Sequence, residues 1–258
     1  KDEANQTFIK GIENTAAVEL FYGGNKKFET SPSGVDVTGT LNVSGISTFG
    51  GALSGTTGTF SSDSTINSVT VGKGANSIGS NTVVGNSALD AAGGTGANNV
   101  AVGYLALTTN TTGNECVAVG SEALEANTTG ARNIAVGYRA LEDNSTGEFN
   151  VAIGSYALPE NTTGDNNVAV GRNALRYNTT ADNNTAIGQQ ALNANTTGAN
   201  NVAVGALALD ANTTANNNTG LGYASLGANT TGGDNTSVGA NALQTNTTAS
   251  FNLSLIHI

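Results

Sequence analysis

The sequence has few aromatic and charged residues, no Trp, no Met and a single Cys, Cys116. Aromatic residues make up 5% of the chain and charged residues 11%, whereas charged residues account for about 25% of an average soluble domain. Small side chains of this kind fill a thin interior but not a wide one, so the composition favours a slim rod over a globular domain. Because Cys116 has no second Cys to pair with, an internal disulfide is excluded.

Basic residues are also scarce. Nine Lys and Arg against 19 Asp and Glu give a net charge of −10. Nucleic acids and anionic membranes bind to basic surfaces, so neither is an expected partner. No apolar run in the sequence reaches the roughly 20 residues of a membrane span, and no signal peptide is visible in it. The absence of Met leads us to interpret the sequence as a fragment or a processed product.

A phrase of the form N-[VI]-A-[VI]-G-x-x-A-L, followed by a polar stretch such as NTT, recurs along most of the chain with a period of 17 residues. We expect the glycine of each copy to form a structural turn, because glycine bends at no steric cost. These glycines are Gly103, Gly120, Gly137, Gly154, Gly171, Gly188, Gly205, Gly222 and Gly239. A fixed period in this range is typical of stacked repeat architectures.

The repeat favours β-structure, because Gly, Asn and Thr recur too densely for two helices in each copy. We predict an all-β fold, a parallel β-solenoid over about residues 67–251 with 17-residue coils. Each coil should hold two short strands and two turns, with the NTT segments as turns and one strand ending near each repeat glycine. At ~4.8 Å per rung, ten coils form a rod roughly 48 Å long.

Side chains alternate along a strand, so Ala101 points opposite to its two Val neighbours. The residue before each glycine is always aliphatic, and we predict that this column is buried: Val102, Val119, Val136, Ile153, Val170, Ile187 and Val204. A second apolar row should be Leu107, Leu124, Leu141 and Leu158. Both faces of the strand are apolar or small. The face that does not line the interior therefore needs a cover, and association is expected to be part of the fold.

The NTT and NST segments each match an N-glycosylation acceptor. Their asparagines are Asn110, Asn127, Asn144, Asn161, Asn178, Asn195, Asn212, Asn229 and Asn246. Recurrence at one position of every coil also suits a ladder of hydrogen-bonded Asn side chains. We favour the ladder over glycans. Regular Thr ranks additionally raise ice binding as an alternative, which is disfavoured because adjacent turn residues do not normally share one flat face.

The repeated phrase resembles the head repeats of YadA-like trimeric autotransporter adhesins, in the form also found in bacteriophage tail fibre proteins with NTTG turns. The resemblance covers about residues 67–251. It implies a left-handed β-roll in which three chains pack side by side as a fibrous homotrimer, with the Ala/Val strand toward the threefold axis. Adhesin head repeats are commonly shorter than 17 residues, so this chain has a longer turn.

The two ends of the chain differ from the repeats. Residues 1–66 are predicted to be a β-rich linker region, with a hairpin over Ala17–Glu29 and short strand pieces from Val35 onward that resemble phage fibre shafts. We expect this region to cap the open end of the solenoid. In residues 252–258 another coil begins, but Ile256 replaces the glycine. We interpret this tail as truncated or non-native.

Residues for enzyme chemistry are nearly absent. The only His is His257, so no Ser-His-Asp or Cys-His arrangement can be assembled. Glu122, Glu125, Glu142 and Asp143 are interpreted as a solvated surface. The segment Gly93–Asn99 resembles a calcium-binding nonapeptide but occurs once and has Asn98 where that motif has Asp. We therefore predict no enzymatic activity, no cofactor and no metal.

The two positions after each repeat glycine vary freely, which marks an outward surface. Aromatic residues and Arg contribute most to binding interfaces, so the predicted receptor-facing residues are Tyr138, Arg139, Tyr156, Arg172 and Tyr223. The predicted function is a structural fibre or adhesin that attaches to a host cell or another extracellular surface. It would be located in a virion tail fibre or on a bacterial cell surface. Its partners would be two further copies of itself and a protein or glycan receptor. The alternatives are an ice-binding and a purely structural solenoid.

Overall fold

The computed structural model describes residues 8–12, 17–22, 25–31, 34–37, 64–66, 69–74 and 78–255. All regular elements in these residues are β-strands. The described residues therefore contain no helix that could cross a membrane. The chain divides into two units, Lys1–Gly58 and Thr59–Ile258. His257 and the rest of the final tripeptide lie outside the described residues.

The first unit contains a four-stranded antiparallel sheet in the order β1-β2-β3-β4. Its strands are β1 (Phe8–Ile12), β2 (Ala17–Tyr22), β3 (Asn25–Ser31) and β4 (Gly34–Val37). Tyr22 pairs with Asn25, so the two strands of the predicted hairpin form as expected, while Gly23 and Gly24 lie outside the described residues. The strand pieces predicted between residues 38 and 63 also lie outside them.

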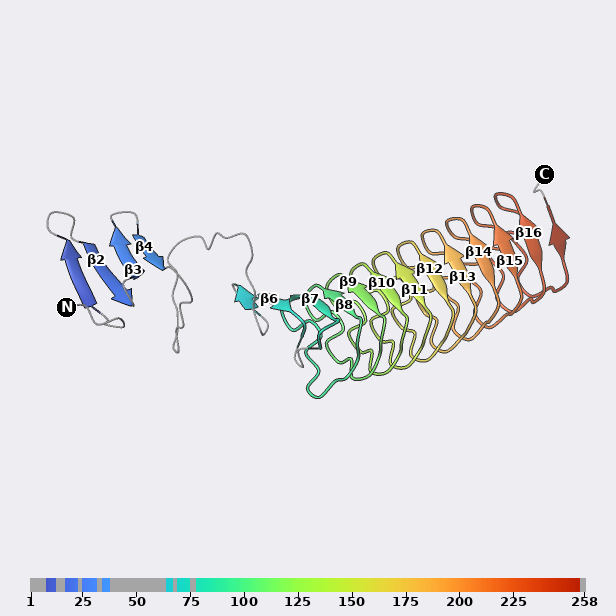
Figure 1. Ribbon diagram of the computed structural model, residues 1–258. Helices are drawn as coiled ribbons and strands as arrows, with labels where there is room; N and C mark the ends of the chain where they lie inside the picture. Colours follow the sequence, from blue (N-terminus) through green and yellow to red (C-terminus); the bar gives the residue numbers. More distant parts are fainter. Residues whose placement is uncertain are drawn as a thin grey trace. The chain divides into compact units, whose positions relative to one another are not determined.

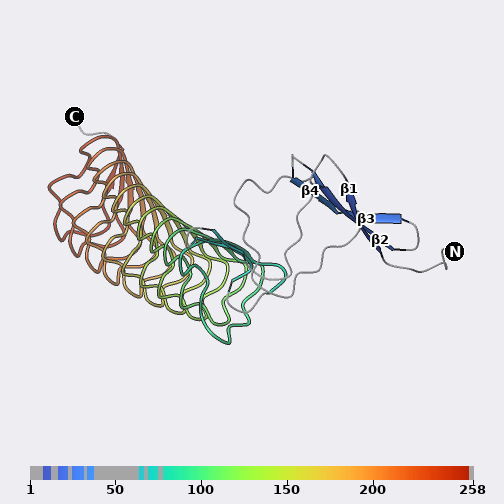
Figure 2. The same ribbon diagram turned by 90° about the vertical axis from the view of Figure 1, so that its left-hand side faces the viewer.

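The second unit is a parallel β-solenoid of about ten coils, as the repeat predicts (Figures 1 and 2). It starts with β5 (Ser64–Ile66), β6 (Val69–Gly72) and β7 (Thr82–Gly85), which pair antiparallel with one another. From β7 onward every pairing is parallel, and each strand pairs with the equivalent strand of the next coil. The later strands are β8 (Val100–Val102), β9 (Val117–Val119), β10 (Ile134–Val136), β11 (Val151–Ile153), β12 (Val168–Val170), β13 (Thr185–Ile187), β14 (Val202–Val204), β15 (Thr219–Leu221), β16 (Thr236–Val238) and β17 (Leu253–Ser254).

Each full coil contains one three-residue strand, which ends at the residue before the repeat glycine. The second strand that we predicted in each coil is absent, and turns take its place. The reason is the backbone conformation after the glycine, where Leu105 and Leu107 have φ angles of 56° and 53°. Left-handed residues at alternate positions bend the chain at each step, so a straight strand cannot form there.

The repeat glycines bend the chain directly after each strand. Gly137 has a φ of 135°, a conformation that side-chain-bearing residues rarely adopt. A Cβ on Gly137 would lie 2.7 Å from the carbonyl carbon of Gly154, the equivalent glycine of the next coil. Glycine is therefore needed at this column for its backbone conformation and for the close approach of neighbouring coils.

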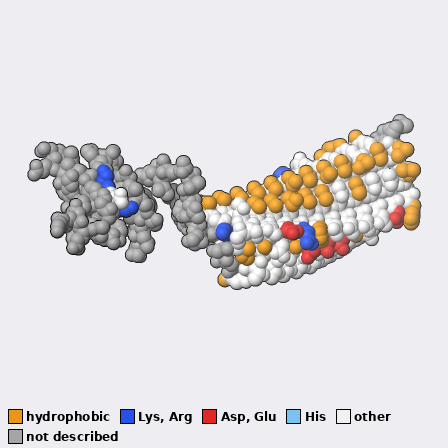
Figure 3. All heavy atoms as spheres, in the orientation of Figure 1, with side chains coloured by type: hydrophobic (Ala, Val, Ile, Leu, Met, Phe, Trp, Pro, Cys, Tyr) orange, Lys and Arg blue, Asp and Glu red, His pale blue; other side chains and the backbone are white. Residues whose placement is uncertain are grey.

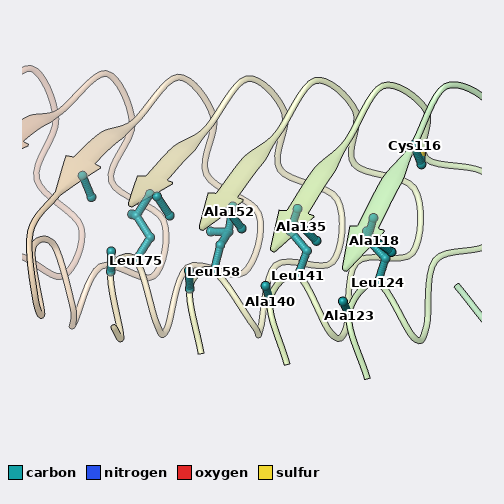
Figure 4. Packing of buried hydrophobic residues seen from close by; sticks show 14 of the residues in the cluster. Cys116, Ala118, Ala123, Leu124, Ala135, Ala140, Leu141, Ala152, Leu158 and Leu175 are labelled. Carbon is teal, nitrogen blue, oxygen red and sulfur yellow. The ribbon is translucent and has the colours of Figure 1, made fainter. Parts of the chain in front are cut away.

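The interior of the solenoid is formed by small residues from the strand and by Leu from the following turn. Ala118 and Ala135 have 0% exposure at the middle of their strands, and Leu124 and Leu141 are equally buried opposite them (Figure 4). The predicted Leu row is thus confirmed: Leu107, Leu124, Leu141 and Leu158 are all fully buried. Because a coil is thin, one Leu per coil fills most of the space, and from Ala101 onward the inward strand position holds only Ala, Gly or Ser, whereas the first coil accommodates Val83.

The aliphatic column before the glycines is not buried, so our choice of strand face was wrong. Ile153, Ile187 and Val204 are 41%, 40% and 36% exposed, and Val102 is half-buried. These side chains point outward in register, since side chains alternate and the neighbouring Ala faces inward. The restriction of the middle strand position to Ala, Gly or Ser from Ala101 to Ser237, with Val83 of the first coil as the exception, was the sequence signal for the inward position.

Candidate interaction surfaces

Two asparagine columns are buried and organise the turns. The first, here called the turn ladder, consists of the NTT and NST asparagines from Asn110 to Asn246. Asn127 Nδ2 donates to Asn110 Oδ1 at 2.8 Å and to the Gly130 carbonyl at 3.0 Å. The same side-chain contact continues from coil to coil up to Asn246, with N–O distances of 2.8–3.2 Å. The predicted ladder is confirmed.

The turn ladder bears directly on the glycosylation motifs. From Asn127 to Asn229 its side chains have 0% exposure, and both Nδ2 hydrogens are donated to carbonyl oxygens. A glycan is attached at Nδ2, which these coils enclose. The buried motifs are therefore structural residues of the folded chain, and glycans do not fit at them.

The second column, here called the strand ladder, precedes each strand: Asn81, Asn99, Asn133, Asn150, Asn167, Asn184, Asn201, Asn218, Asn235 and Asn252. The backbone N–H of Asn150 donates to Asn133 Oδ1 at 2.9 Å, and Asn150 Nδ2 donates to the Gly164 carbonyl at 2.8 Å. The backbone N–H of Asn150 thus bonds to the preceding coil and its side chain to the following one. The ladder satisfies buried backbone groups at the start of the strands.

Cys116 interrupts the strand ladder. Its backbone N–H donates to Asn99 Oδ1 at 2.9 Å, and its thiol lies 3.4 Å from the Gly130 carbonyl, the place that an Asn Nδ2 takes in other coils. Burial raises the pKa of the Cys116 thiol, while the backbone N–H groups of Asn133 and Arg132 act in the opposite direction. A buried thiol with a raised pKa is a structural residue and a poor nucleophile.

An exposed apolar surface, here called the apolar stripe, lies on the outer face of the strands. It consists of the first and last residues of each three-residue strand, from Val100 and Val102 to Thr236 and Val238. Figure 3 shows these hydrophobic side chains as continuous rows along the solenoid. The stripe includes the aliphatic column that we had predicted to be buried, and it lies beside the buried column of Ala101 and Ala118. Contiguous apolar surface of this kind marks an association site.

A cluster of aromatic and Arg side chains, here called the Tyr–Arg cluster, lies on the turns after the glycines. Tyr138 and Tyr156, from adjacent coils, make an edge-to-face contact with centroids 5.3 Å apart. The Arg139 guanidinium lies 5.2 Å from the Tyr138 centroid. Arg176 lies 5.0 Å from the Tyr156 centroid and 5.4 Å from that of Tyr177. Tyr138 and Tyr177 are exposed and Tyr156 is half-buried, and rings held by cation–π contacts offer a pre-ordered binding surface.

The structure brings together three of the five predicted receptor-facing residues, Tyr138, Arg139 and Tyr156. Arg172 is exposed but makes no contact with the cluster that the structure records. Tyr223 lies three coils beyond Arg172 and is 54% exposed. The sequence reasoning missed Arg176 and Tyr177. Both follow the buried Leu175, outside the two variable positions considered, although a basic and an aromatic residue there were a usable signal.

Three half-buried carboxylates adjoin this cluster. Glu122, Glu125 and Glu142 have oxygen atoms within 4.8 Å of one another. Arg139 Nε forms a salt bridge with Glu122 Oε2 and lies 3.5 Å from Glu142 Oε1. Burial raises the pKa of Glu142, and Arg139 partly counteracts this. The group is an ion-pair network that links adjacent coils.

Comparison with protein-family models gives no match, and comparisons with curated proteins and with solved structures give none either. The class of protein is therefore defined by its geometry: a β-solenoid repeat protein with 17-residue coils and asparagine ladders.

Proposed function

We propose that this chain is part of a non-enzymatic extracellular fibre that presents a receptor-binding surface, as a phage tail fibre or the head of a bacterial trimeric adhesin does. The observation that carries the proposal is the apolar stripe on a rod whose other exposed surfaces are polar or aromatic. The resemblance of the repeated phrase to YadA-like head repeats adds the left-handed, three-chain arrangement. The buried ladders add stiffness, which suits a spacer.

In this proposal the apolar stripe packs against two further copies of the chain. Half-exposed Ile and Val side chains such as Ile153 and Ile187 repeat at every rung, so copies aligned side by side would bury a continuous seam. Burial of each aliphatic side chain contributes about 1 kcal/mol or more. In this proposal a seam of about ten such rungs is the main contact between the three chains.

The Tyr–Arg cluster then appears once per chain on the outside of the trimer. Three copies convert weak single contacts into a much tighter combined attachment, because the second and third contacts form within one complex. The receptor would be a protein or a glycan on a host cell.

The mass of the particle tests the assembly. Light scattering should give three times the chain mass of 25.6 kDa. The double variant Ile153→Asp/Ile187→Asp should lower this mass toward that of one chain, because it places charge in the seam. The control Thr163→Asp, on an exposed turn, should stay trimeric. A wild-type chain that is folded and monomeric refutes the trimer.

Adhesion tests the function itself. Fluorescently labelled wild-type protein should bind a panel of bacterial and eukaryotic cell surfaces, and Tyr138→Ala/Tyr156→Ala should reduce binding about tenfold. Tyr104→Ala is the matched control, because Tyr104 is 53% exposed and lies outside the cluster. A trimer that binds no cell surface leaves only a scaffold role.

One observation favours the second candidate, ice binding. The second Thr of each NTT pair, such as Thr112 and Thr129, forms an exposed column along the rod. The hydroxyl of the first Thr is already hydrogen-bonded to the next coil: Thr111 Oγ1 donates to the Thr128 carbonyl at 2.9 Å. A single free Thr column gives a narrow surface, so ice binding remains the weaker candidate. Thermal hysteresis in solution would support it over adhesion.

A further inference from the structure

One coil lacks a large side chain that its neighbours have. Five residues after each repeat glycine stand Thr108, Glu125, Glu142, Pro159, Arg176, Asn193, Asp210, Gly227 and Gln244. Gly227 is the one member of this column without a side chain. Its φ is not in the left-handed region, so the backbone does not require glycine there. The break in the column therefore calls for another explanation.

The missing side chain leaves a hollow of about 270 Å³ on the outer surface. Its floor is formed by small residues, Gly227, Ala224 and Ala228, and its borders are Leu207, Asp210, Tyr223 and Gln244. Ligand pockets in proteins start at about 300 Å³. This hollow therefore suits one small ring and not an extended ligand.

The polar atoms around the hollow point to the kind of ligand. Asp210 Oδ1 lies 3.3 Å from the position that a Cβ on Gly227 would occupy. The carboxylate therefore borders the space that a side chain at this position would fill. Backbone N–H groups of Asp210 and Ala211 hold this carboxylate, and partial burial raises its pKa. Asp210 makes no salt bridge within the described part of the chain. Gln244 adds an amide donor and an acceptor at the opposite border.

Tyr223 supplies the remaining feature, an exposed aromatic ring at the rim. The C–H face of a pyranose ring packs against an aromatic face, while its hydroxyls need acceptors and donors at the edge of the site. We propose that the hollow at Gly227 binds one neutral saccharide unit, with Tyr223 stacking on the sugar ring and Asp210 and Gln244 bonding to its hydroxyls.

The charge of the site restricts the sugar. An acidic saccharide would meet the Asp210 carboxylate on a chain whose net charge is −10, so repulsion disfavours it. The inference rests on the proposed function, since a glycan site on an adhesive fibre gives its receptor a chemical class. It differs from that proposal in depending on the three adjacent coils that contribute Asp210, Gly227 and Gln244, and not on the Tyr–Arg cluster.

Saturation-transfer NMR on the full chain tests the site with methyl glycosides of glucose, galactose, mannose and N-acetylglucosamine, and with methylammonium as an amine probe. At least one glycoside should bind the wild type. Gly227→Gln, which restores a large side chain to the column, should weaken this binding by about tenfold or more. Asp210→Asn and Tyr223→Ala should weaken it as well. Asn193→Gln, at the same column in an unbroken coil, is the matched control and should bind normally.

The outcomes separate this inference from the proposed function. No glycoside binding, binding that Gly227→Gln leaves unchanged, or binding of methylammonium alone each overturns the saccharide site. Cell adhesion is measured in parallel with the same variants. A wild type that adheres to cells but binds no glycoside retains the proposed function and loses the inference, whereas glycoside binding without cell adhesion does the reverse.

Discussion

The interior of the solenoid and its outer surface follow different rules. Inside, each column keeps nearly one residue type along the rod: mostly Ala on the strand, with Val83, Gly220 and Ser237 as exceptions, Leu after the turn, and Asn in the two ladders except at Cys116. Outside, the positions after the glycines range from Tyr138 to Gln189 and Ala240. Each interior residue packs against its own copy one coil away, so a change at one coil affects both neighbours.

This difference shows which positions of the repeat can vary in residue type and which cannot. A column whose members contact one another tolerates few changes, because the space and the hydrogen bonds are set by the coils on both sides. A column that faces solvent has no such constraint and is free to carry binding residues. The Tyr–Arg cluster and the hollow at Gly227 both lie in such columns.

The substitution expected to lower the stability of the interior most is Leu158→Ala. Leu158 is fully buried, and the cavity left by the variant should cost about 4 kcal/mol of unfolding free energy. Leu105→Ala is the control, because Leu105 has a similar left-handed φ but is half-buried on the outside. Urea unfolding at fixed protein concentration measures both. Equal losses for the two variants would show that interior and surface do not differ in this way.

The glycine columns give a second comparison. Gly137→Ala should cost about 3 kcal/mol, because the new Cβ meets the backbone of Gly154 and the φ of 135° is unsuitable for Ala. A Cβ on Gly147 of the same coil would also meet backbone, 2.5 Å from the Gly164 carbonyl oxygen, but Gly147 has no left-handed φ and Ala181 and Ala215 already occupy that column, so Gly147→Ala should cost less. Thermal and urea unfolding would measure the difference, and a reversed order would contradict it.

The turn ladder is tested by Asn161→Ala. The variant removes two donated bonds, to Asn144 Oδ1 and the Gly164 carbonyl, and one accepted from Asn178. Buried partners left unsatisfied should cost about 2 kcal/mol. Thr163→Ala, exposed in the same turn, should change stability by less than about 0.5 kcal/mol. A neutral Asn161→Ala variant would mean that water replaces the ladder at no cost.

The smallest expected effect is a gain. Cys116→Asn should extend the strand ladder between Asn99 and Asn133 and stabilise the protein by about 1 kcal/mol. Cys116→Ala is the matched control, because it removes the thiol without adding an amide and should destabilise. If both variants behave alike, the ladder contributes nothing at this coil.

Much of the fold could be predicted from the sequence. The 17-residue period and the Gly, Asn and Thr content predicted parallel coils, the strand ends and the turn ladder, which the structure confirms. The face of the strand could not be decided by hydrophobicity alone. Val102 is more apolar than Ala101, yet Ala101 is buried, because the space inside a thin coil selected size over hydrophobicity.

The candidate surfaces were predicted less completely. Tyr138, Arg139 and Tyr156 were identified from their variable columns, whereas Arg176 and Tyr177 join them only through the shape of the turn. The hollow depends on a glycine that resembles a turn residue in the sequence. Gly227 is recognised as an exception only when the coils are aligned, because Asp210 and Gln244 occupy the same position in the neighbouring coils.

The sequence by itself determined the repeat, because stacking identical coils requires the same small residues at the same positions. The tertiary structure decided which side chains point inward and which polar groups meet. The physical reason is that contacts between coils join residues 17 positions apart, such as Asn127 with Asn110. Their geometry depends on three non-glycine residues per coil that have left-handed φ angles, such as Leu105, Leu107 and Glu115. A Leu or Glu does not indicate this conformation in the sequence.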